Sequence, residues 1–271
     1  MDKLLQSTDC LWTTEVFEID PKKIYVEQIN TPAMVMYQKH MSKAIWRPAP
    51  GRKLAFLVKH EEKLLGLIFL ASPVINLGVR DEYLGLEKEN RGFKLRHYMD
   101  ISVCVGSQPL AWYWNIGKLL AMIATTLGDY FQERYHEELF GLTTTSLYGR
   151  GTQYNRVYKF LGYTKGFGHE HIDDEEYHKM LVYMEENNIE VPSCKFGAGS
   201  NARMRRIAAY KKATGDDSIK LFHGHKRGVY YHAAIDSQKR QKIIFDWYQK
   251  WGKPRYDRVK HKQAPYSTGL E

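Results

Sequence analysis

Hydroxyl-bearing side chains gather around one glycine-rich turn near the middle of the chain. The segment 139–166 reads LFGLTTTSLYGRGTQYNRVYKFLGYTKG. Its pattern predicts a buried strand over 139–147, a turn at 149–151, a short helix over 152–160 and a second strand behind it. Gly162 would end this helix in the left-handed conformation that glycine adopts most easily. The segment therefore predicts a strand–turn–helix–strand unit that carries several hydroxyls.

Tyr154 is the first candidate catalytic residue. It precedes Tyr158 by one helical turn and Leu161 by two, so the three side chains would share one face of the predicted helix. A phenol hydroxyl can act as a general acid or donate a hydrogen bond to a leaving group. The alternative is a core tyrosine whose hydroxyl is satisfied inside the protein. The residues alone leave these two interpretations open.

A second segment predicts a phosphate-binding helix start. Residues 97–106 (HYMDISVCVG) read as a central strand, and apolar residues at helical spacing predict a helix that begins near Asn115. Asn is a good N-cap, and Gly117 leaves room beside the exposed backbone N–H groups of the first turn. A helix N-terminus that points out of a sheet binds phosphate readily. The aromatic residues 112–114 (WYW) precede it in what we expect to be a loop.

Four sequence blocks resemble a known group of proteins in their order and spacing. The blocks are RDEYLG at 80–85, NIGKLL at 115–120, RGTQY at 150–154 and LGYTKG at 161–166. The order of elements around them resembles the cofactor-binding half of the GNAT superfamily of acyltransferases. More narrowly, 66–166 is similar to the phage Mom-like DNA-modification proteins and the related Druantia DruA-like proteins, which are divergent GNAT-like groups.

This resemblance implies a fold and an activity. The fold would be α+β, with a GNAT-like mixed, centrally splayed β-sheet flanked by helices and a basic C-terminal helix and hairpin extension. The activity would be transfer of an acyl or aminoacyl-type group to a DNA base by a phage-encoded protein, from acetyl-coenzyme A or another activated acyl or aminoacyl donor. The base would have to be flipped or single-stranded to react. The implied donor-binding residues are Val105, Gln108, Asn115, Ile116, Gly117 and Lys118.

The implied catalytic residues are Tyr154, Ser146 and Thr152, which would face the transferred group. Two departures from the family pattern bear on the activity. The families carry an aspartate at the end of the strand, where this chain has only hydroxyls at 144–146 (TTS). Bulky residues at 112–114 stand where the superfamily has a glycine-rich loop, and they cannot bring their backbone as close to a pyrophosphate. The alternative function is therefore a non-catalytic DNA-binding protein of the same fold, acting in phage defence or counter-defence.

Positive charge is concentrated in the C-terminal quarter of the chain. The whole chain has a formal net charge of +9, and 195–262 alone holds 18 Lys and Arg against five Asp. Lys and Arg neutralise phosphates, and exposed aromatic rings stack on bases, so this pattern indicates a nucleic-acid surface. The alternative is a solvated basic face whose tryptophans are core anchors. The candidate nucleic-acid-binding residues are Arg203, Arg205, Arg206, Lys226, Arg227, Trp247 and Trp251.

The remaining segments predict a conventional arrangement of elements. In order, we expect a strand at 24–29, a helix at 32–44, a hairpin of strands 53–60 and 63–73, a polar helical crossing at 84–97, and helices at 171–188 and 201–215. We place the core in residues 1–170, followed by an inserted helix and a basic, aromatic-rich extension over 171–271. The hairpin expected at 220–235, with its turn at 226–228, could complete the core sheet.

Several classes of protein are excluded by composition. No run of 18 apolar residues occurs, so no membrane span is expected, and the N-terminus does not read as a signal peptide. Three widely spaced cysteines suit a reducing cytoplasm, which would be the host's for a phage protein. The His-x-His pairs at 169–171 and 223–225 could ligate a metal, but no third ligand has recognisable spacing, so we predict no metal site. The pattern gives no indication of oligomeric state.

Overall fold

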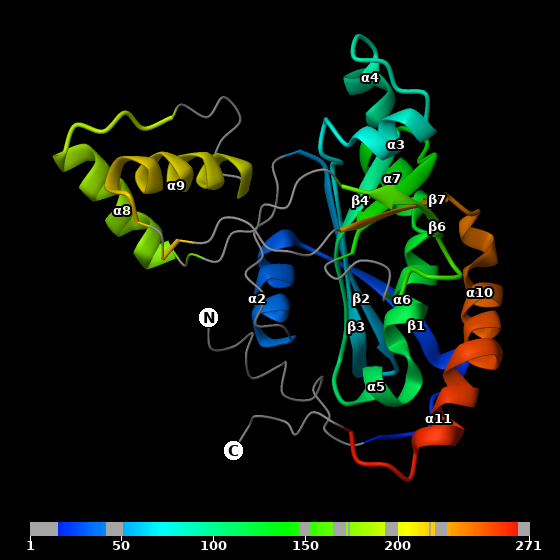
Figure 1. Cartoon of the computed structure of the whole chain (residues 1–271). Coiled ribbons are helices and arrows are strands. Elements are labelled where there is room, and N and C mark those ends of the chain that lie inside the picture. The colour runs from blue at the N-terminus through cyan, green and yellow to red at the C-terminus, as the bar shows by residue number, and fades with distance from the viewer. Residues whose placement is uncertain are drawn as a thin grey trace.

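The computed structural model describes residues 16–41, 51–146, 152–164, 172, 174–192, 200–216, 218–219 and 227–264. Its centre is a seven-stranded sheet in the order β1-β2-β3-β4-β5-β7-β6, flanked by helices (Figure 1). The strands are β1 Ile24–Ile29, β2 Lys53–His60, β3 Lys63–Ala71, β4 Tyr98–Gly106, β5 Gly141–Thr145, β6 Lys159–Tyr163 and β7 Gly228–Ala233. The helices are α2 Thr31–Met41, α3 Gly78–Tyr83, α4 Arg91–Leu95, α5 Leu110–Trp114, α6 Ile116–Ala124, α7 Gly128–Tyr135, α8 Asp174–Glu186, α9 Ser200–Thr214, α10 Arg240–Trp247 and α11 Lys253–Val259.

The sheet is mostly antiparallel, which confirms the predicted α+β class. Strands β1 to β4 pair antiparallel in sequence order, and the hairpin of β2 and β3 turns at Glu61 and Glu62 as predicted. Glu61 adopts a left-handed backbone (φ 52°) that closes this tight turn. The apolar sequences of β2 and β3 are buried on both faces because helices cover both sides of the sheet. β4 is the middle strand of the seven, as its sequence predicted.

The sheet opens in its middle, where β4 and β5 separate. These two strands pair in parallel from Tyr98 opposite Gly141 to Asp100 opposite Thr143, although β4 continues to Gly106. Beyond Asp100 the ladder between them ends. This separation is the central splay that we expected of the sheet.

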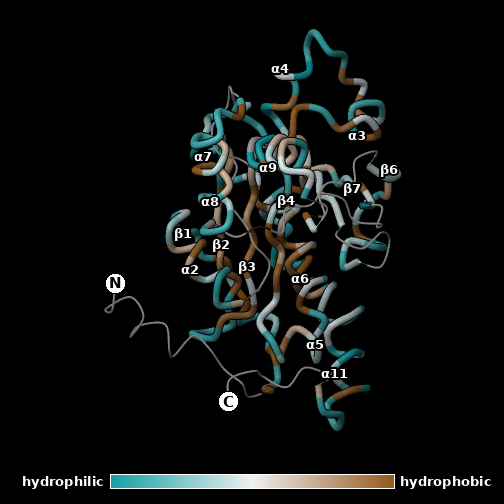
Figure 2. Tube along the Cα trace, turned by 60° about the vertical axis from the view of Figure 1, so that its left-hand side comes forward, coloured by the Kyte–Doolittle hydropathy of each residue, from teal (hydrophilic) through white to brown (hydrophobic). Residues whose placement is uncertain are grey.

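Two hydrophobic clusters fill the two sides of the sheet. The larger lies under α5, α6, α10 and α11, and it contains the fully buried Trp114, Leu120 and Trp247. The smaller lies under α2 and contains Met34 and Phe69, which are also fully buried. Figure 2 shows the apolar residues concentrated along β3, β4 and α6. Burial on both sides holds β4, with its polar residues, rigidly between the layers.

The C-terminal segment contributes a strand to the core sheet, as we expected that the segment 220–235 could do. β7 pairs with β5 on one side and β6 on the other, so a strand from this segment completes the sheet. α10 packs on α6, and a π-helical turn at Tyr248–Gly252 continues into α11. Gly228, which we placed in the turn at 226–228, begins β7, and the residues 220–226 lie outside the described residues. The physical reason is the apolar content of the segment, since Trp247 is fully buried.

The predicted helix at 152–160 is the main error in the secondary structure. Residues 152–158 form turns, and the chain then enters β6 at Lys159. Gly162 therefore lies in a strand with φ 144°, at an irregularity of the β6–β7 ladder, and does not end a helix. The pairing with β7 comes from residues about 70 positions further along the chain, so a local pattern could not reveal it.

Two smaller differences concern the segments before and after β4. The aromatic residues 112–114 lie in the helix α5, where a loop was expected. The polar crossing at 84–97 contains a helix only at its end, α4. Residues 42–50 lie outside the described residues, so the predicted extension of the helix α2 past Met41 is not tested.

Helices α8 and α9 form a unit of their own beside the sheet (Figure 1). Their apolar side chains pack in a separate cluster that includes Tyr177, Met180 and Ile207. Gly215, with φ 70°, directly follows α9. The inserted element is therefore a pair of helices, and the core resumes after it.

In the part of the chain that the structure describes, no helix is long and apolar enough to cross a membrane. No group of three or more His, Cys, Asp and Glu that could hold a metal ion occurs among these residues either. The histidine pairs of the sequence lie outside the described residues.

Candidate functional site

Tyr154 lies in the core on the α6 side of the sheet. Its ring packs edge-on against Tyr158 (centroids 5.4 Å apart) and tilts against Tyr230 (5.8 Å). Its hydroxyl is near Thr144 and Cys104, and burial raises the pKa of this phenol well above its usual value. A phenol with a raised pKa keeps its proton at neutral pH, so it can donate a hydrogen bond but does not act as a base. The burial matches the core alternative for Tyr154 more closely than an open catalytic position.

The other two predicted catalytic hydroxyls have partners within the protein. Ser146 Oγ accepts a hydrogen bond from the Gly228 N–H (2.9 Å) and donates one to the Gly228 carbonyl (3.4 Å). It therefore joins the end of β5 to the start of β7. Thr152 Oγ1 accepts a hydrogen bond from the Tyr154 N–H (3.4 Å) inside the turn. Ser146 and Thr152 thus hold the chain that surrounds Tyr154.

The predicted donor-binding residues divide between the core and the surface. Asn115 precedes α6 with a left-handed backbone (φ 55°), and its side chain caps no N–H group. Ile116 is fully buried, and Lys118 is buried with its ammonium donating to the Asn155 carbonyl. Burial, with a smaller contribution from Arg156, lowers the pKa of Lys118 to about 8.

Val105 and Gln108 have environments that differ from that of the helix start. Val105 is half-buried against the cluster under α2, and Gln108 is exposed. Val105 therefore faces the cluster under α2, whereas Ile116 is buried in the cluster on the other side of the sheet.

Gln153 occupies the gap that opens between β4 and β5. Its Nε2 donates to the Cys104 carbonyl of β4 (2.8 Å), a group that the β4–β5 ladder leaves without a strand partner. The same side chain covers the first turn of α6, because a Cβ placed on Gly117 would come within 3.4 Å of it. From the other side, Trp247 Nε1 donates to the Asn115 carbonyl (3.3 Å). The protein's own side chains therefore fill the space where a donor was expected.

The predicted nucleic-acid residues differ in their accessibility. Arg203 is buried with its guanidinium 3.8 Å over the Tyr177 ring, and one Nη donates to the Ile172 carbonyl (3.1 Å). Arg206 donates to the Tyr177 hydroxyl (3.2 Å), whereas Arg205 is exposed. Arg203 therefore holds α9 against α8, which corrects its assignment as a phosphate ligand.

Trp247 is the clearer correction, because a fully buried indole cannot stack on a base. Trp251 is half-buried, with the ammonium groups of Lys118 and Lys250 at 5.8 and 4.8 Å from its ring. Arg227 is half-buried beside β6, where its carbonyl accepts from the Thr164 N–H (2.9 Å). Lys226 lies outside the described residues.

The opposite face of the sheet carries a row of aromatic side chains that the sequence analysis missed. His97 stacks on Phe140 (centroids 4.5 Å apart, 13° between planes), and Phe140 meets Tyr98 edge-on (6.1 Å). Tyr98 is followed by Tyr231 (6.5 Å), and Tyr231 by Tyr83 (5.3 Å). The contacts are continuous across α3, β4, the start of β5 and β7, which meet at the upper end of the sheet in Figure 1. We call these five side chains the aromatic row.

A cation and a carboxyl lie beside the aromatic row. The exposed Lys159 of β6 places its ammonium 4.2 Å from the centre of the Tyr83 ring. Asp100 of β4 accepts a hydrogen bond from the Thr143 hydroxyl (3.1 Å). Burial raises the pKa of Asp100 to about 6, although Thr143 and Arg80 act in the opposite direction. This carboxyl changes protonation within the range of physiological pH.

Arg80 and Asp81 fix α3 and with it Tyr83. Arg80 is fully buried, and its guanidinium donates to Asp81 Oδ1 (2.8 Å from Nε) and to the carbonyls of Val74 (2.7 Å) and Ile75 (3.1 Å). Asp81 Oδ2 accepts from the N–H of Leu77 at the start of α3 (3.0 Å). A buried charge pair of this kind is kept only when its remaining donors and acceptors are satisfied. The RDEYLG block is thus an anchor for the aromatic row.

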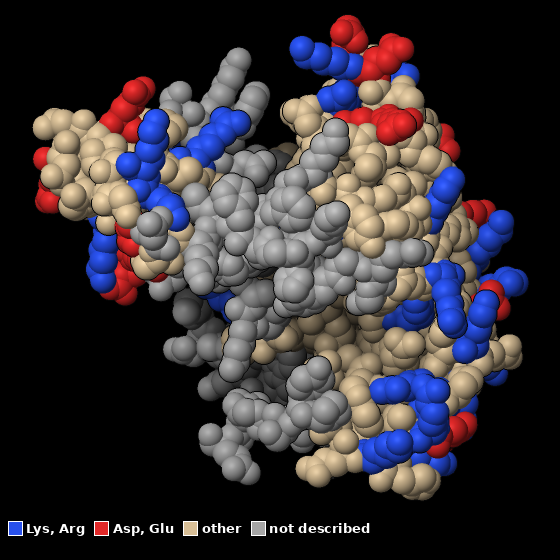
Figure 3. Space-filling model, viewed as in Figure 1, with Lys and Arg blue, Asp and Glu red and all other residues tan. Residues whose placement is uncertain are grey.

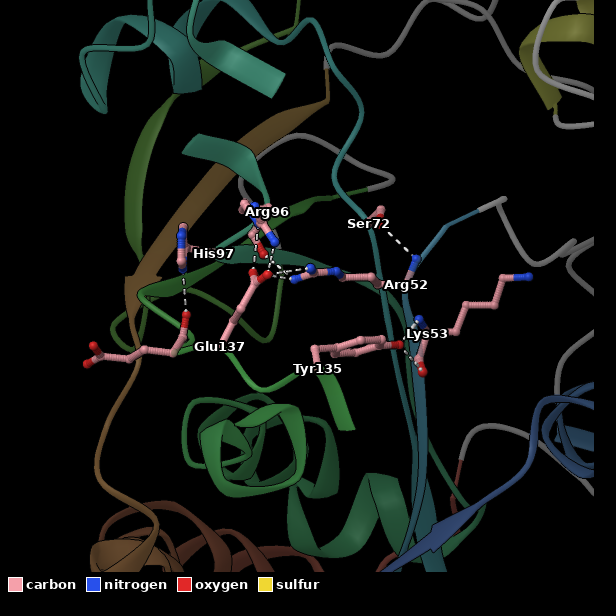
Figure 4. Close-up of polar contacts among 8 residues, drawn as sticks. Arg52, Lys53, Ser72, Arg96, His97, Tyr135 and Glu137 are labelled. Carbon is pink, nitrogen blue, oxygen red and sulfur yellow. Dashed lines mark hydrogen bonds and ion pairs between the residues drawn. The ribbon is translucent and has the colours of Figure 1, made fainter. Parts of the chain in front are cut away.

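A second ionic cluster fixes the other end of the row (Figure 4). Glu137 accepts from both Nη atoms of Arg52 (2.9 and 3.0 Å) and from Nε of Arg96 (2.9 Å). These hydrogen bonds lower the pKa of Glu137 to about 2. The next residue, Glu138, accepts from Nδ1 of His97 through its carbonyl (3.0 Å). Arg52 also lies 4.8 Å over the Tyr135 ring, which ties the cluster to α7.

Comparison with known proteins shows the family of this chain. The family described as Druantia protein DruA matches residues 36–241. The chain belongs to this family. A Druantia protein DruA of Escherichia coli (strain UMEA 4076-1) is 32% identical over 204 residues, which are 66% of this chain and 50% of that protein. The chain therefore spans about half the length of this curated relative.

The DruA match confirms one part of the resemblance found in the sequence. It runs from α2 to the start of α10, so it includes Tyr154, Asp100 and the whole aromatic row. The likeness to Mom-like proteins and to the GNAT superfamily stays a prediction. The DruA family match also contains the α8–α9 unit, so this pair of helices lies within the region shared with the family.

Proposed function

We propose that this chain binds nucleic acid in a phage-defence or counter-defence system. The observation that carries the proposal is the basic surface formed by the last described segment. Residues 237–264 contain nine Lys and Arg against two Asp. Figure 3 shows Lys and Arg gathered on the lower right of the molecule, over α10 and α11. Membership of the Druantia protein DruA family supports the defence setting.

Part of this basic surface is neutralised and part is available to phosphates. Two lysines pair with the aspartates one turn along their own helices, Lys242 with Asp246 (2.9 Å) and Lys253 with Asp257 (2.5 Å). Lys250 and Arg258 are exposed and form no ion pair among the described residues. Exposed cations of this kind neutralise phosphates and release counterions, so the affinity should fall steeply with salt.

The test is a salt titration of binding. The affinity of the chain for labelled DNA is measured by fluorescence anisotropy over a range of salt concentrations, for the wild type and for Lys250→Ala/Arg258→Ala. We expect the log–log slope to fall by about one unit per lost phosphate contact. The matched control is Lys22→Ala/Lys39→Ala, which removes the same charge from exposed positions on other elements. Equal slopes for the two double variants would contradict the assignment of this surface.

Transfer of an acyl or aminoacyl-type group to a DNA base is a second proposal. It is favoured by the early end of the β4–β5 ladder, where the Gln153 side chain bonds to the Cys104 carbonyl, and by the phenol of Tyr154 beside it. A donor could enter only if Gln153 left the Cys104 carbonyl. We therefore expect Gln153→Ala to bind acetyl-coenzyme A or an aminoacyl donor at least as tightly as the wild type, measured by calorimetric titration.

The chemical outcome is tested separately, by mass spectrometry of nucleosides from DNA co-expressed with the protein. Under the transferase proposal, Tyr154→Phe should abolish the modification while DNA binding persists, because only the hydroxyl is lost. Tyr158→Phe is the matched control, since the Tyr158 hydroxyl donates to the Ala121 carbonyl inside the core (2.9 Å). If no modified base appears with any donor tried, the transferase proposal fails and only the nucleic-acid-binding proposal remains.

A further inference from the structure

The aromatic row is open to solvent at two of its members. Phe140 is 45% exposed and Tyr83 is 43% exposed, whereas Tyr98, Tyr231 and His97 are half-buried. If these rings served only as part of the core, we would expect a helix to cover them. Contiguous exposed aromatic surface on a folded domain marks a binding site.

The row is also held rigid before any ligand arrives. At one end, the buried Arg80 fixes the helix that carries Tyr83, and at the other, Arg52 and Glu137 fix the segment that carries Phe140. Tyr98 and Tyr231 stand on β4 and β7, the two strands that flank β5 in the sheet. Aromatic rings that are already ordered lose little conformational entropy when a flat partner stacks on them.

The charge at the row fits a phosphate-bearing ligand. Lys159 is exposed and holds its ammonium over the Tyr83 ring, so a base stacked near Tyr83 would bring its phosphate toward a cation. Base–aromatic stacking combined with neighbouring cations is how proteins bind single-stranded nucleic acid with little sequence preference. In a duplex the base faces are covered by their neighbours, so only unpaired bases can reach such rings.

We infer that the aromatic row stacks unpaired bases, so that the ligand of this chain is single-stranded or locally unpaired DNA. This inference rests on the proposed nucleic-acid binding and names its substrate class. The aromatic row stacks on the bases, and the basic surface of α10 and α11 binds the sugar–phosphate backbone. The two surfaces make separable contributions, one dependent on stacking and the other on salt.

The experiment compares a labelled single strand with a duplex of the same sequence by fluorescence anisotropy at fixed salt. We expect the wild type to prefer the single strand. Tyr83→Ala and Phe140→Ala should each weaken single-strand binding by about 5- to 150-fold, because stacking contributes about 1–3 kcal/mol per base. Their duplex affinity and the salt slope should stay unchanged. Thermal unfolding of each variant shows that the fold is intact.

Two controls make the outcome specific. Phe93→Ala removes an equally large ring that is 68% exposed on α4 but lies outside the row, so its single-strand affinity should match the wild type. Tyr83→Trp should keep or strengthen binding, because a larger ring still stacks. Equal wild-type affinity for both forms, unaffected by Tyr83→Ala and Phe140→Ala, would overturn the inference and leave the proposed binding standing. Absence of all nucleic-acid binding would overturn both.

Discussion

Tyr230 and Tyr231 are adjacent in β7 and have opposite environments. Tyr230 is fully buried, with its hydroxyl donating to the Asn155 side chain (3.0 Å) and its ring against Tyr154. Tyr231 is half-buried on the other face, in the aromatic row. Because side chains alternate across a strand, one position of register separates a core tyrosine from a tyrosine of the aromatic row.

The two faces also differ in how their polar groups are used. On the closed face of Tyr154, the hydroxyls and amides bond to backbone carbonyls, as Gln153 does to Cys104 and Tyr158 to Ala121. On the open face of Tyr231, a carboxyl with a raised pKa and an exposed lysine lie beside solvent-facing rings. The comparison assigns stability to the closed face, and to the open face the base contacts that we propose.

The largest expected effect tests this assignment by stability. Tyr230→Ala should lower the free energy of unfolding by about 3–5 kcal/mol, because it empties a fully buried site and removes a hydrogen bond. Tyr231→Ala should cost only about 1 kcal/mol, since that ring is partly solvated already. The measurement is chemical unfolding followed by circular dichroism. Similar losses for the two variants would show that both faces are core.

A smaller effect concerns Asp100 and depends on pH. Its pKa is raised from 3.8 to about 6 in the folded protein, so between these values the folded state binds more protons than the unfolded state. Stability that is present below pH 3.8 is therefore lost as the pH rises through 6. Asp100→Asn keeps an oxygen that accepts from Thr143 and cannot ionise. It should stabilise the protein by about 1–2 kcal/mol above this window and not below it. No gain at neutral pH would show that the carboxylate is well solvated.

The smallest expected effect concerns Glu137. The shift of its pKa has the opposite sign to that of Asp100. Its pKa is lowered from 4.5 to about 2, so the stability it contributes is present above pH 4.5 and is lost as the pH falls toward 2. Glu137→Gln should lower the melting temperature at neutral pH, and the difference from the wild type should shrink through that window. Glu133→Gln on α7 is the control, because Glu133 is exposed. A pH-independent difference would show that shape, and not charge, matters at Glu137.

Local patterns predicted much of the first half of the fold. β1, the β2–β3 hairpin and β4 follow from apolar runs and a short acidic turn, which act over a few residues. The start of α6 near Asn115 was predicted for the same reason. The helix expected at 152–160 failed because the turn before β6 is decided by pairing with β7. Trp247 was misjudged because exposure depends on α6, far away in the sequence.

The candidate site was only partly accessible from sequence. The RDEYLG block was recognised, but its physical role as the anchor of α3 required the contacts of Arg80. The aromatic row joins residues from four separate segments, so no spacing rule connects them. Its one local signal was alternation, since Tyr98 and Asp100 fall on one face of a strand whose other face is apolar.

The sequence by itself determined the α+β class, the central strand, the family and the position of the positive charge, because these depend on composition and on contacts between near neighbours. The tertiary structure decided which tyrosines are buried, what fills the gap between β4 and β5, and which surface is open. Those outcomes depend on the register of β7 and the packing of α10, whose partners lie about 70 to 130 residues away. A strand's alternation places half of its side chains on each face, but only the neighbouring elements decide which face is covered.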